Sequence, residues 1–243
     1  MRRYVLAAVS LAFLLGCARK ELIRPPKRAE IVEQVLGSLQ EESRRLRTLK
    51  AFGTLTGSEG QRGYFANFVL LYRKPGQFRL DLTGPFGLAI MSMVSDGKTA
   101  RAYYPETGEL FEGEPSLFLP VDLGPGEIEK MVLGTIEPPS DLRRAIVFSK
   151  AGSYILESPE QAWEMEVDGT DMRVRRYRKE REGNSPLEVI MSQYRRVDGL
   201  IRPYRIEIQQ PKERKKLRID CSRQILNEGL REEVFELTVP ERK

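Results

Sequence analysis

The chain contains 243 residues, of which 40% are hydrophobic, 31% charged and 8% aromatic, and its mean hydropathy is −0.42. This balance predicts a folded body with an apolar core, because disordered chains lack the large apolar side chains that a core needs. The absence of histidine and the presence of only two cysteines exclude a Ser-His-Asp triad and a Cys/His zinc site. The length suits one sizeable domain or two small ones.

The first 16 residues have the pattern of a bacterial lipoprotein signal peptide. Arg2 and Arg3 precede an apolar run from Tyr4 to Leu15 that is too short to span a bilayer as a lasting helix. The run ends in Leu-Leu-Gly-Cys, which resembles a lipobox, and the resemblance implies cleavage before Cys17 and acylation of that cysteine as a lipid anchor. The alternatives are an ordinary secretory signal with a chance cysteine, or an uncleaved N-terminal membrane anchor.

Residues 17–27 are expected to form the acylated N-terminus and a short, stiff tether that contains Pro25 and Pro26. Two or three acyl chains would hold the protein firmly at a membrane, since each buried methylene contributes about 0.8 kcal/mol. Ala18 stands where an inner-membrane retention signal would place aspartate, so the resemblance implies sorting to the outer membrane. Loss of Arg2 and Arg3 with the signal lowers the net charge of +5 by two, which leaves a mild bias and no nucleic-acid signature.

Residues 29–50 are predicted to form an amphipathic helix. Apolar residues recur there at spacings compatible with a 3.6-residue period, while most charged residues fall on the other side. We expect the apolar stripe to pack against a sheet. A helix lying on a membrane surface is the alternative, which the mixed charges and the lack of aromatic anchors disfavour. The apolar positions are Ile31, Val32, Val35, Leu36, Leu39, Leu46 and Leu49.

From residue 51 onward, apolar and polar residues alternate as they do in β-strands. Turns rich in glycine and proline separate the strands so closely that no helices fit between them, which predicts an antiparallel meander. The clearest hairpin runs from Gln77 to Ser95, and its turn Gly84-Pro85-Phe86-Gly87 carries an aromatic side chain at the tip. The first six predicted strands are residues 51–57, 64–74, 77–83, 88–95, 98–104 and 109–113.

Residues 114–141 interrupt this periodicity with five prolines and three glycines. We interpret them as loops around one short helix near Ile128, Met131 and Val132, which could cover one mouth of the sheet. Strands then resume to the end of the chain. The predicted segments are residues 144–150, 153–158, 162–169, 172–182, 187–199, 200–210, 215–227 and 234–240.

These features together resemble the LolB and LolA family of lipoprotein-binding proteins. The resemblance rests on the lipobox, the N-terminal helix, the run from Leu71 to Gly113, the helix EIEKMVLG and the closing run from Lys215 to Pro240. It implies a mainly β fold of the α+β class over residues 28–243: an open, strongly curved antiparallel sheet, or half-barrel, capped by helices. The apolar concave face of such a sheet would hold acyl chains.

In proteins of this family a protruding turn between two strands projects an apolar side chain that helps to deliver lipoproteins to the membrane. The matching segment here is Pro85, Phe86, Gly87 and Leu88, with Phe86 in place of the family's leucine. The alternative is that Phe86 folds back and caps the core. The candidates for the acyl-chain cavity, each of which could instead be ordinary core, are Phe65, Val69, Phe78, Leu80, Leu82, Met91 and Met93.

Two basic clusters, Arg173–Arg181 and Lys212–Lys216, are interpreted as charges that block pairing at a sheet edge. Contact with anionic lipid headgroups is the alternative. Cys221, which has no partner once Cys17 is acylated, is expected to be a buried thiol.

We therefore expect a lipid-anchored receptor on the periplasmic face of the outer membrane, which accepts acylated lipoproteins from a LolA-like periplasmic carrier and inserts them into that membrane. Exposing one acyl chain to water costs on the order of 10 kcal/mol, so such cargo needs an apolar shelter. The alternatives are a LolA-like envelope sensor that binds a lipidated signal, and a structural envelope lipoprotein without transfer activity. We expect a monomer with no cofactor, metal or nucleic acid, and no enzyme, since no nucleophile-base pair stands out.

Overall fold

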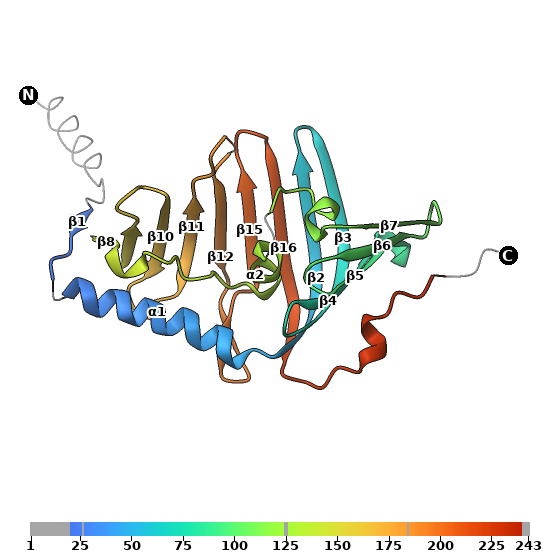
Figure 1. Ribbon diagram of the computed structural model, residues 1–243, viewed down its shortest axis with the longest axis horizontal. Helices are drawn as coiled ribbons and strands as arrows, with labels where there is room; N and C mark the ends of the chain where they lie inside the picture. The colour runs from blue at the N-terminus through green and yellow to red at the C-terminus, as the bar shows by residue number, and fades with distance from the viewer. Residues whose placement is uncertain (1–19, 26, 124–125, 184, 240–243) are drawn as a thin grey trace, which may run out of the picture.

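Figure 1 shows a computed structural model of the chain, which describes residues 20–25, 27–123, 126–183 and 185–239. The predicted signal peptide and Cys17 lie outside the described residues. The described part consists of one large open sheet, a small hairpin and two α-helices, α1 (Lys27–Arg45) and α2 (Glu127–Leu133). Neither of these helices has the length and apolar character that crossing a membrane requires.

The sheet has fourteen strands within the described residues, and all of its neighbouring strands pair antiparallel. Their order is β1-β8-β9-β10-β11-β12-β15-β16-β2-β3-β4-β5-β6-β7, so β1 and β7 are the two open edges. Strands β13 (Arg195–Val197) and β14 (Leu200–Arg202) form the separate hairpin. The bounds of the other strands are β1 Glu21–Leu22, β2 Thr48–Glu59, β3 Arg62–Arg73, β4 Gln77–Thr83, β5 Ala89–Ser95, β6 Ala100–Tyr104, β7 Glu109–Gly113, β8 Ile146–Lys150, β9 Ser153–Glu157, β10 Trp163–Asp168, β11 Val174–Lys179, β12 Leu187–Ser192, β15 Arg205–Gln210 and β16 Lys215–Leu226.

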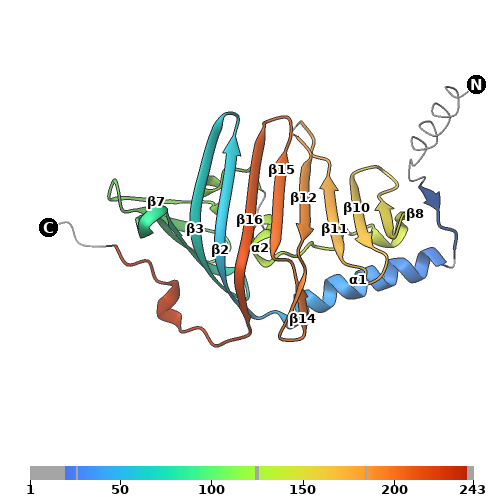
Figure 2. The same cartoon turned by 180° about the vertical axis from the view of Figure 1, so that it is seen from behind.

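Two meanders, β2–β7 and β8–β16, join where β16 pairs with β2 at the centre of the sheet (Figures 1 and 2). The pairing runs from Lys215 opposite Glu59 to Leu226 opposite Leu49. Gly53 permits a close approach at this seam, because a Cβ atom there would lie 2.0 Å from the carbonyl oxygen of Asp220. The seam makes one continuous sheet from the two halves of the sequence.

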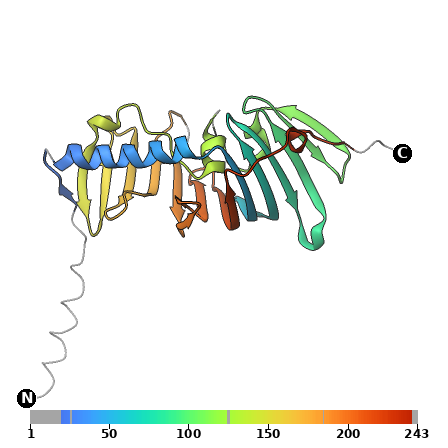
Figure 3. The ribbon, with the colours of Figure 1, turned by 90° about the horizontal axis from the view of Figure 1, so that it is seen from below.

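The strand register carries a row of apolar side chains across one face of the sheet. Leu217 lies opposite Ile208, and the row continues through Val189, Tyr177 and Met165 on β12, β11 and β10. Alternation in each strand keeps these residues on one side. We call this side the inner face, because α1 and α2 lie on it, and Figure 3 shows α1 running along that side of the sheet.

Helix α1 buries its apolar stripe against the β8–β12 half of the inner face, as predicted (Figure 1). Its buried residues include Glu42, whose carboxylate pairs with Arg173 at 2.5 Å. The helix ends at Arg45, five residues before the predicted end, because Leu49 already belongs to β2. Leu46 and Leu49 are both buried in the core, so their apolar character fits either element.

Helix α2 confirms the predicted short helix and covers the inner face near β2–β5. Ile128 and Met131 point toward the sheet and are buried. The hydroxyl of Tyr72 on β3 donates a 2.5 Å hydrogen bond to the carboxylate of Glu129, which ties the helix to the sheet. Burial and this hydrogen bond raise the pKa of Tyr72.

The N-terminal segment predicted as a tether is docked on the sheet where the structure describes it. Strand β1 pairs with β8, and the amide of Ile23 donates to the carbonyl oxygen of Val147 at 2.7 Å. Lys20 pairs with Glu157 at 2.6 Å. The described chain therefore begins at the β1 edge of the sheet.

The predicted strand at residues 234–240 is wrong for its described part. Glu232–Phe235 instead form a 3-10 turn, and the residues that follow it belong to no strand. The segment crosses Arg79 of β4, whose guanidinium donates to the carbonyl oxygens of Val234 and Glu236. Because β3 and β5 already occupy both edges of β4, no free strand edge is available there.

The interpretation of the basic clusters as edge protection is also wrong. Strand β11 lies between β10 and β12, and Lys215 and Lys216 begin β16, which lies between β15 and β2. The charges that lie on these strands are placed on the faces of the sheet, and several pair with carboxylates, as Arg176 does with Glu188 at 3.3 Å. Lys212 and Arg214 lie in the turn before β16. Sequence alone did not show that these strands are central.

Candidate functional site

Two hollows on the inner face differ greatly in size. The first, here called the covered cavity, lies between α2 and strands β2–β5, β15 and β16, and its open volume is about 40 Å³. The second, here called the open groove, lies between strands β10–β12 and β15 and the segment of residues 135–141, and its volume is about 820 Å³. Ligand sites in proteins occupy about 300–1,000 Å³, so of these two hollows the open groove is the one with room for a ligand.

Three of the predicted acyl-chain residues, Phe78, Leu80 and Met93, line the covered cavity. Leu82 and Met91 share their face, because Leu82 lies opposite Met91 and Leu80 lies opposite Met93. The cavity is small because side chains from α2 and the sheet fill the space between them. A volume of 40 Å³ holds a few water molecules at most.

The other two predicted residues, Phe65 and Val69, lie on the opposite, outer face. They alternate along β3 with Phe68 and Leu70, which are buried on the inner face. Val69 is the register partner of Asp81, whereas Phe68 is the partner of Leu82. The structure therefore divides the seven candidates between two faces of the sheet.

The open groove has an apolar floor that the sequence interpretation did not nominate. Its floor is formed by side chains on the inner face of β10–β12 and β15, and Ile136, Pro138 and Pro139 line its wall. The alternating pattern of each strand marks these residues as facing one side, but only the path of residues 135–141 shows that the space above them is open. The floor residues are Trp163, Tyr177, Leu187, Val189 and Ile208.

Polar side chains hold the ends of the groove in place. The indole nitrogen of Trp163 donates to Asp141 at 2.7 Å, and the hydroxyl of Ser158 donates to the same carboxylate at 2.8 Å. Burial alone would raise the pKa of Asp141, but these two hydrogen bonds outweigh it and lower the pKa. At neutral pH the ionised carboxylate therefore fixes Trp163 against the wall segment.

The pKa of the Tyr177 hydroxyl is raised, in contrast to the lowered pKa of Asp141. Burial raises the pKa of Tyr177 to about 12, and the nearby carboxylates of Glu127, Asp141 and Glu137 add to the shift. Lys179 and Arg181 pair with Glu127 at the same rim, Lys179 at 3.2 Å. The groove therefore combines a neutral floor with a charged rim, on which Glu127 is paired, whereas Lys130, Glu137, Arg144 and Glu160 form no salt bridge among the described residues. The neutral floor suits the apolar part of a ligand better than a charged part.

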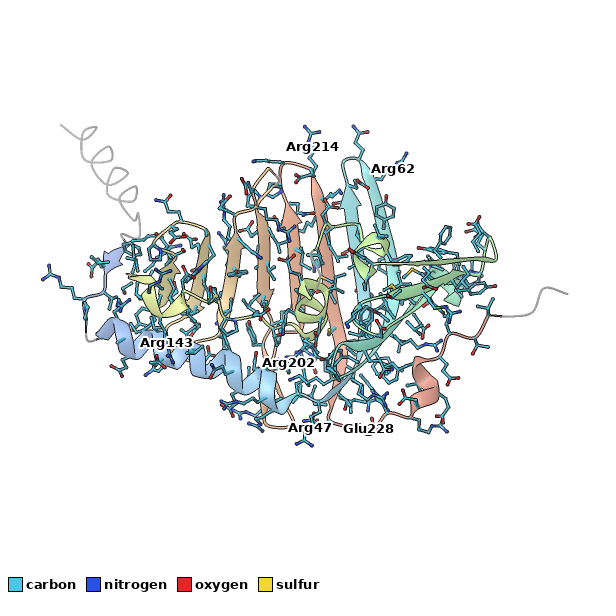
Figure 4. All side chains as sticks on the ribbon, viewed as in Figure 1. Arg47, Arg62, Arg143, Arg202, Arg214 and Glu228 are labelled. Atoms are coloured by element: carbon cyan, nitrogen blue, oxygen red, sulfur yellow. The ribbon has the colours of Figure 1, made fainter. Side chains whose placement is uncertain are left out.

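Arg202 is a fully buried charge between the covered cavity and α1 (Figure 4). Its guanidinium donates to the carbonyl oxygen of Leu133 at the end of α2 and, over 3.4 Å, to Gln224. Burial lowers the pKa of Arg202, while attraction by Glu42 raises it. These contacts link the end of α2 to the seam strand β16.

The turn between β4 and β5 projects from the sheet (Figure 3). Phe86 at its tip is fully exposed, with 103% relative exposure, and Leu88 is 70% exposed, so Phe86 does not fold back on the core. The turn is closed by a 2.7 Å hydrogen bond from the amide of Gly84 to the carbonyl oxygen of Leu88. Phe86 has a left-handed backbone, with φ of 62°, which side-chain-bearing residues rarely adopt.

Comparison of the sequence with protein-family models gives no match, and comparison with curated protein sequences gives none. Solved structures do resemble the fold. A DUF1329 family protein from Desulfovibrio piger has a TM-score of 0.57 at 12% identity, over 85% of this chain and 96% of that chain. A LolA superfamily protein from Nitrosomonas europaea has a TM-score of 0.56 at 13% identity, over 85% and 97%. A putative outer membrane lipoprotein-sorting protein domain from Vibrio parahaemolyticus has a TM-score of 0.54 at 11% identity, over 84% and 97%.

The predicted fold class is confirmed: the chain folds as a large, open antiparallel sheet with two helices, as in LolA-like proteins. At these identities the likeness concerns the fold and does not distinguish LolB from other members of the group.

Proposed function

We propose that this protein binds the acyl chains of lipoproteins or lipids in the open groove, within the cell envelope. The observation that carries the proposal is a volume of about 820 Å³ above an apolar floor on the inner face. Hydrocarbon chains are recognised through apolar area rather than through directed hydrogen bonds, which matches the neutral floor. The similarity in fold to a lipoprotein-sorting domain supports the same class of ligand.

We further propose that an acylated Cys17 anchors the protein at the outer membrane, where it receives lipoproteins from a periplasmic carrier and inserts them. The fully exposed Phe86 turn supports this role over simple storage of a ligand. An aromatic side chain with no protein contacts gains free energy only when another apolar phase meets it, such as a bilayer or an acyl chain.

The protein carries its own reporters for the binding step. Trp163, the single tryptophan, lines the open groove, whereas Cys221 lines the covered cavity. The protein from residue 17 onward with Cys17→Ser retains every described element and lacks the predicted lipid. Brominated palmitate bound in the groove should quench Trp163 fluorescence. A palmitoylated peptide should compete for the groove and relieve the quenching. The rate at which Cys221 is alkylated should be the same with and without the brominated palmitate.

Val189→Phe tests the location, because a larger side chain on the floor fills the groove while staying apolar. We expect it to weaken quenching, whereas Val69→Phe on the outer face should leave quenching unchanged as the matched control. Protection of Cys221 without quenching of Trp163 would move the site to the covered cavity. The absence of both effects would refute lipid binding.

The receptor role needs a separate test in cells. Depletion of the protein should leave lipoproteins on their carrier or in the inner membrane, and reintroduction of the intact chain should restore delivery. A change in gene expression with normal delivery would instead indicate a sensor.

A further inference from the structure

Strand β7 is the longer of the two open edges of the sheet. It pairs with β6 along Glu109–Gly113, and no strand among the described residues pairs with its other side. Strand β1, at the opposite edge, has only two residues. Four of the five residues of β7 are exposed. An edge of this length presents unpaired N–H and C=O groups that can accept another strand.

Apolar surface borders this edge. Leu110 and Phe111 are 45% and 47% exposed, and Leu117, just after the strand, is 74% exposed. A hollow of about 490 Å³ lies beside the strand, and Phe111 packs edge-on against Tyr104 there, with ring centroids 5.6 Å apart. Alternate side chains of an added strand would find apolar contacts at this hollow.

The same edge carries unbalanced negative charge. Glu106, Glu109, Glu112 and Glu114 are exposed, and in the part of the chain that the structure describes none of them forms a salt bridge. Arg101 is the register partner of Glu112 on β6, and it too is exposed. The charge disfavours a second copy of β7, since two copies would bring glutamates together, and it disfavours an anionic membrane surface.

We propose that β7 accepts an extended segment of a protein partner, bound as an added antiparallel or parallel strand, that carries both basic and apolar residues on each of its two faces. Alternation along β7 places Glu109 with Phe111 on one face and Leu110 with Glu112 on the other. Backbone hydrogen bonds to the edge would supply affinity, the hollow beside Phe111 would take an apolar side chain, and the glutamates would select basic residues. This surface is separate from the open groove, which lies on β10–β12 and β15.

The probe is a fluorescent eight-residue peptide with the repeat Lys-Lys-Val-Val, which puts both residue types on each face of an added strand, titrated against the protein from residue 17 onward with Cys17→Ser. We expect binding that weakens with salt, because exposed charges are screened over about 10 Å at 0.1 M ionic strength. Glu109→Lys with Glu112→Lys should weaken binding about tenfold or more. The matched control, Glu182→Lys with Glu233→Lys, reverses two exposed charges elsewhere and should leave the affinity unchanged.

A second peptide, N-methylated at alternate residues, separates strand addition from charge attraction. It has the same charges but loses backbone donors, so it should fail to bind. Equal binding of both peptides, or equal binding by the β7 variant and its control, would overturn the proposal. A dimer that dissociates in the Glu109→Lys, Glu112→Lys variant would also overturn it, because the occupant would then be a second copy.

Discussion

Replacing Phe86 with glycine should change stability and membrane binding in opposite directions. Phe86 has no packing to lose, since it is fully exposed, and its φ of 62° lies in the left-handed region. That conformation costs a residue with a Cβ atom about 1–2 kcal/mol, while glycine loses about 0.5–1 kcal/mol more conformational entropy on folding. The free energy of unfolding should therefore stay constant or rise by about 1 kcal/mol.

Membrane binding should fall in the same variant. Burial of a phenylalanine side chain contributes about 1.5–3 kcal/mol, and each 1.4 kcal/mol is about tenfold in affinity. We expect Phe86→Gly to weaken association with phosphatidylcholine vesicles by about 10- to 100-fold, measured by cosedimentation, while urea titration follows stability. Phe86→Leu should retain vesicle binding. The control is Phe65→Ala, which removes a half-exposed aromatic side chain from the outer face. A clear loss of stability, or unchanged vesicle binding, would refute this reasoning.

Other changes test the core and its charges. Phe86→Glu should abolish lipoprotein delivery in cells while leaving fold and cargo binding intact, and normal delivery would remove Phe86 from the mechanism. Met93→Ala removes a side chain with 1% exposure and should lower the free energy of unfolding by about 2–4 kcal/mol. Urea titration measures this loss. A loss below about 1 kcal/mol would mean that α2 moves in to fill the cavity left by the side chain. Burial raises the pKa of Glu42 above 4.5 despite Arg202 and Arg173, so the folded state binds this proton more tightly and stability falls as pH rises through the raised pKa; Glu42→Gln should flatten that fall above pH 4.5, as urea titration at a series of pH values would show. The amide of Thr170 and the side chain of Arg175 lower the pKa of Asp168 to about 2, so its contribution is present above pH 3.8 and lost as pH falls through 2; Asp168→Asn should cost about 1 kcal/mol at pH 7 and much less at pH 2, and an equal cost at both would contradict this origin.

Most strands could be predicted because burial on one face imposes a period of two on the sequence. The same signal failed at Leu46 and Leu49, which are buried in the core whether they belong to a helix or a strand. It also failed at residues 234–240, because alternation does not show whether a free strand edge lies nearby.

The site was harder to predict than the fold. Phe65 and Val69 are as apolar as Phe78 and Leu80, and only the register between β3 and β4 places them on opposite faces. The covered cavity and the open groove differ in volume because residues 114–145 follow different paths above the two halves of the sheet. Those paths depend on contacts between distant parts of the chain. No local pattern in a strand reports whether a loop fills the space above it.

The pairing of β2 with β16 determines when the sheet can be completed during folding. Ser222 donates to the carbonyl oxygen of Phe52, 170 positions earlier, so the central hydrogen bonds form only after β16, the last of the described strands, has been synthesised. Until then β2 has twelve residues exposed along one side, which is a long template for mispairing with other chains. A chaperone that holds the incomplete chain would therefore be expected to bind β2, and slow assembly of the seam would limit the yield of correctly folded protein.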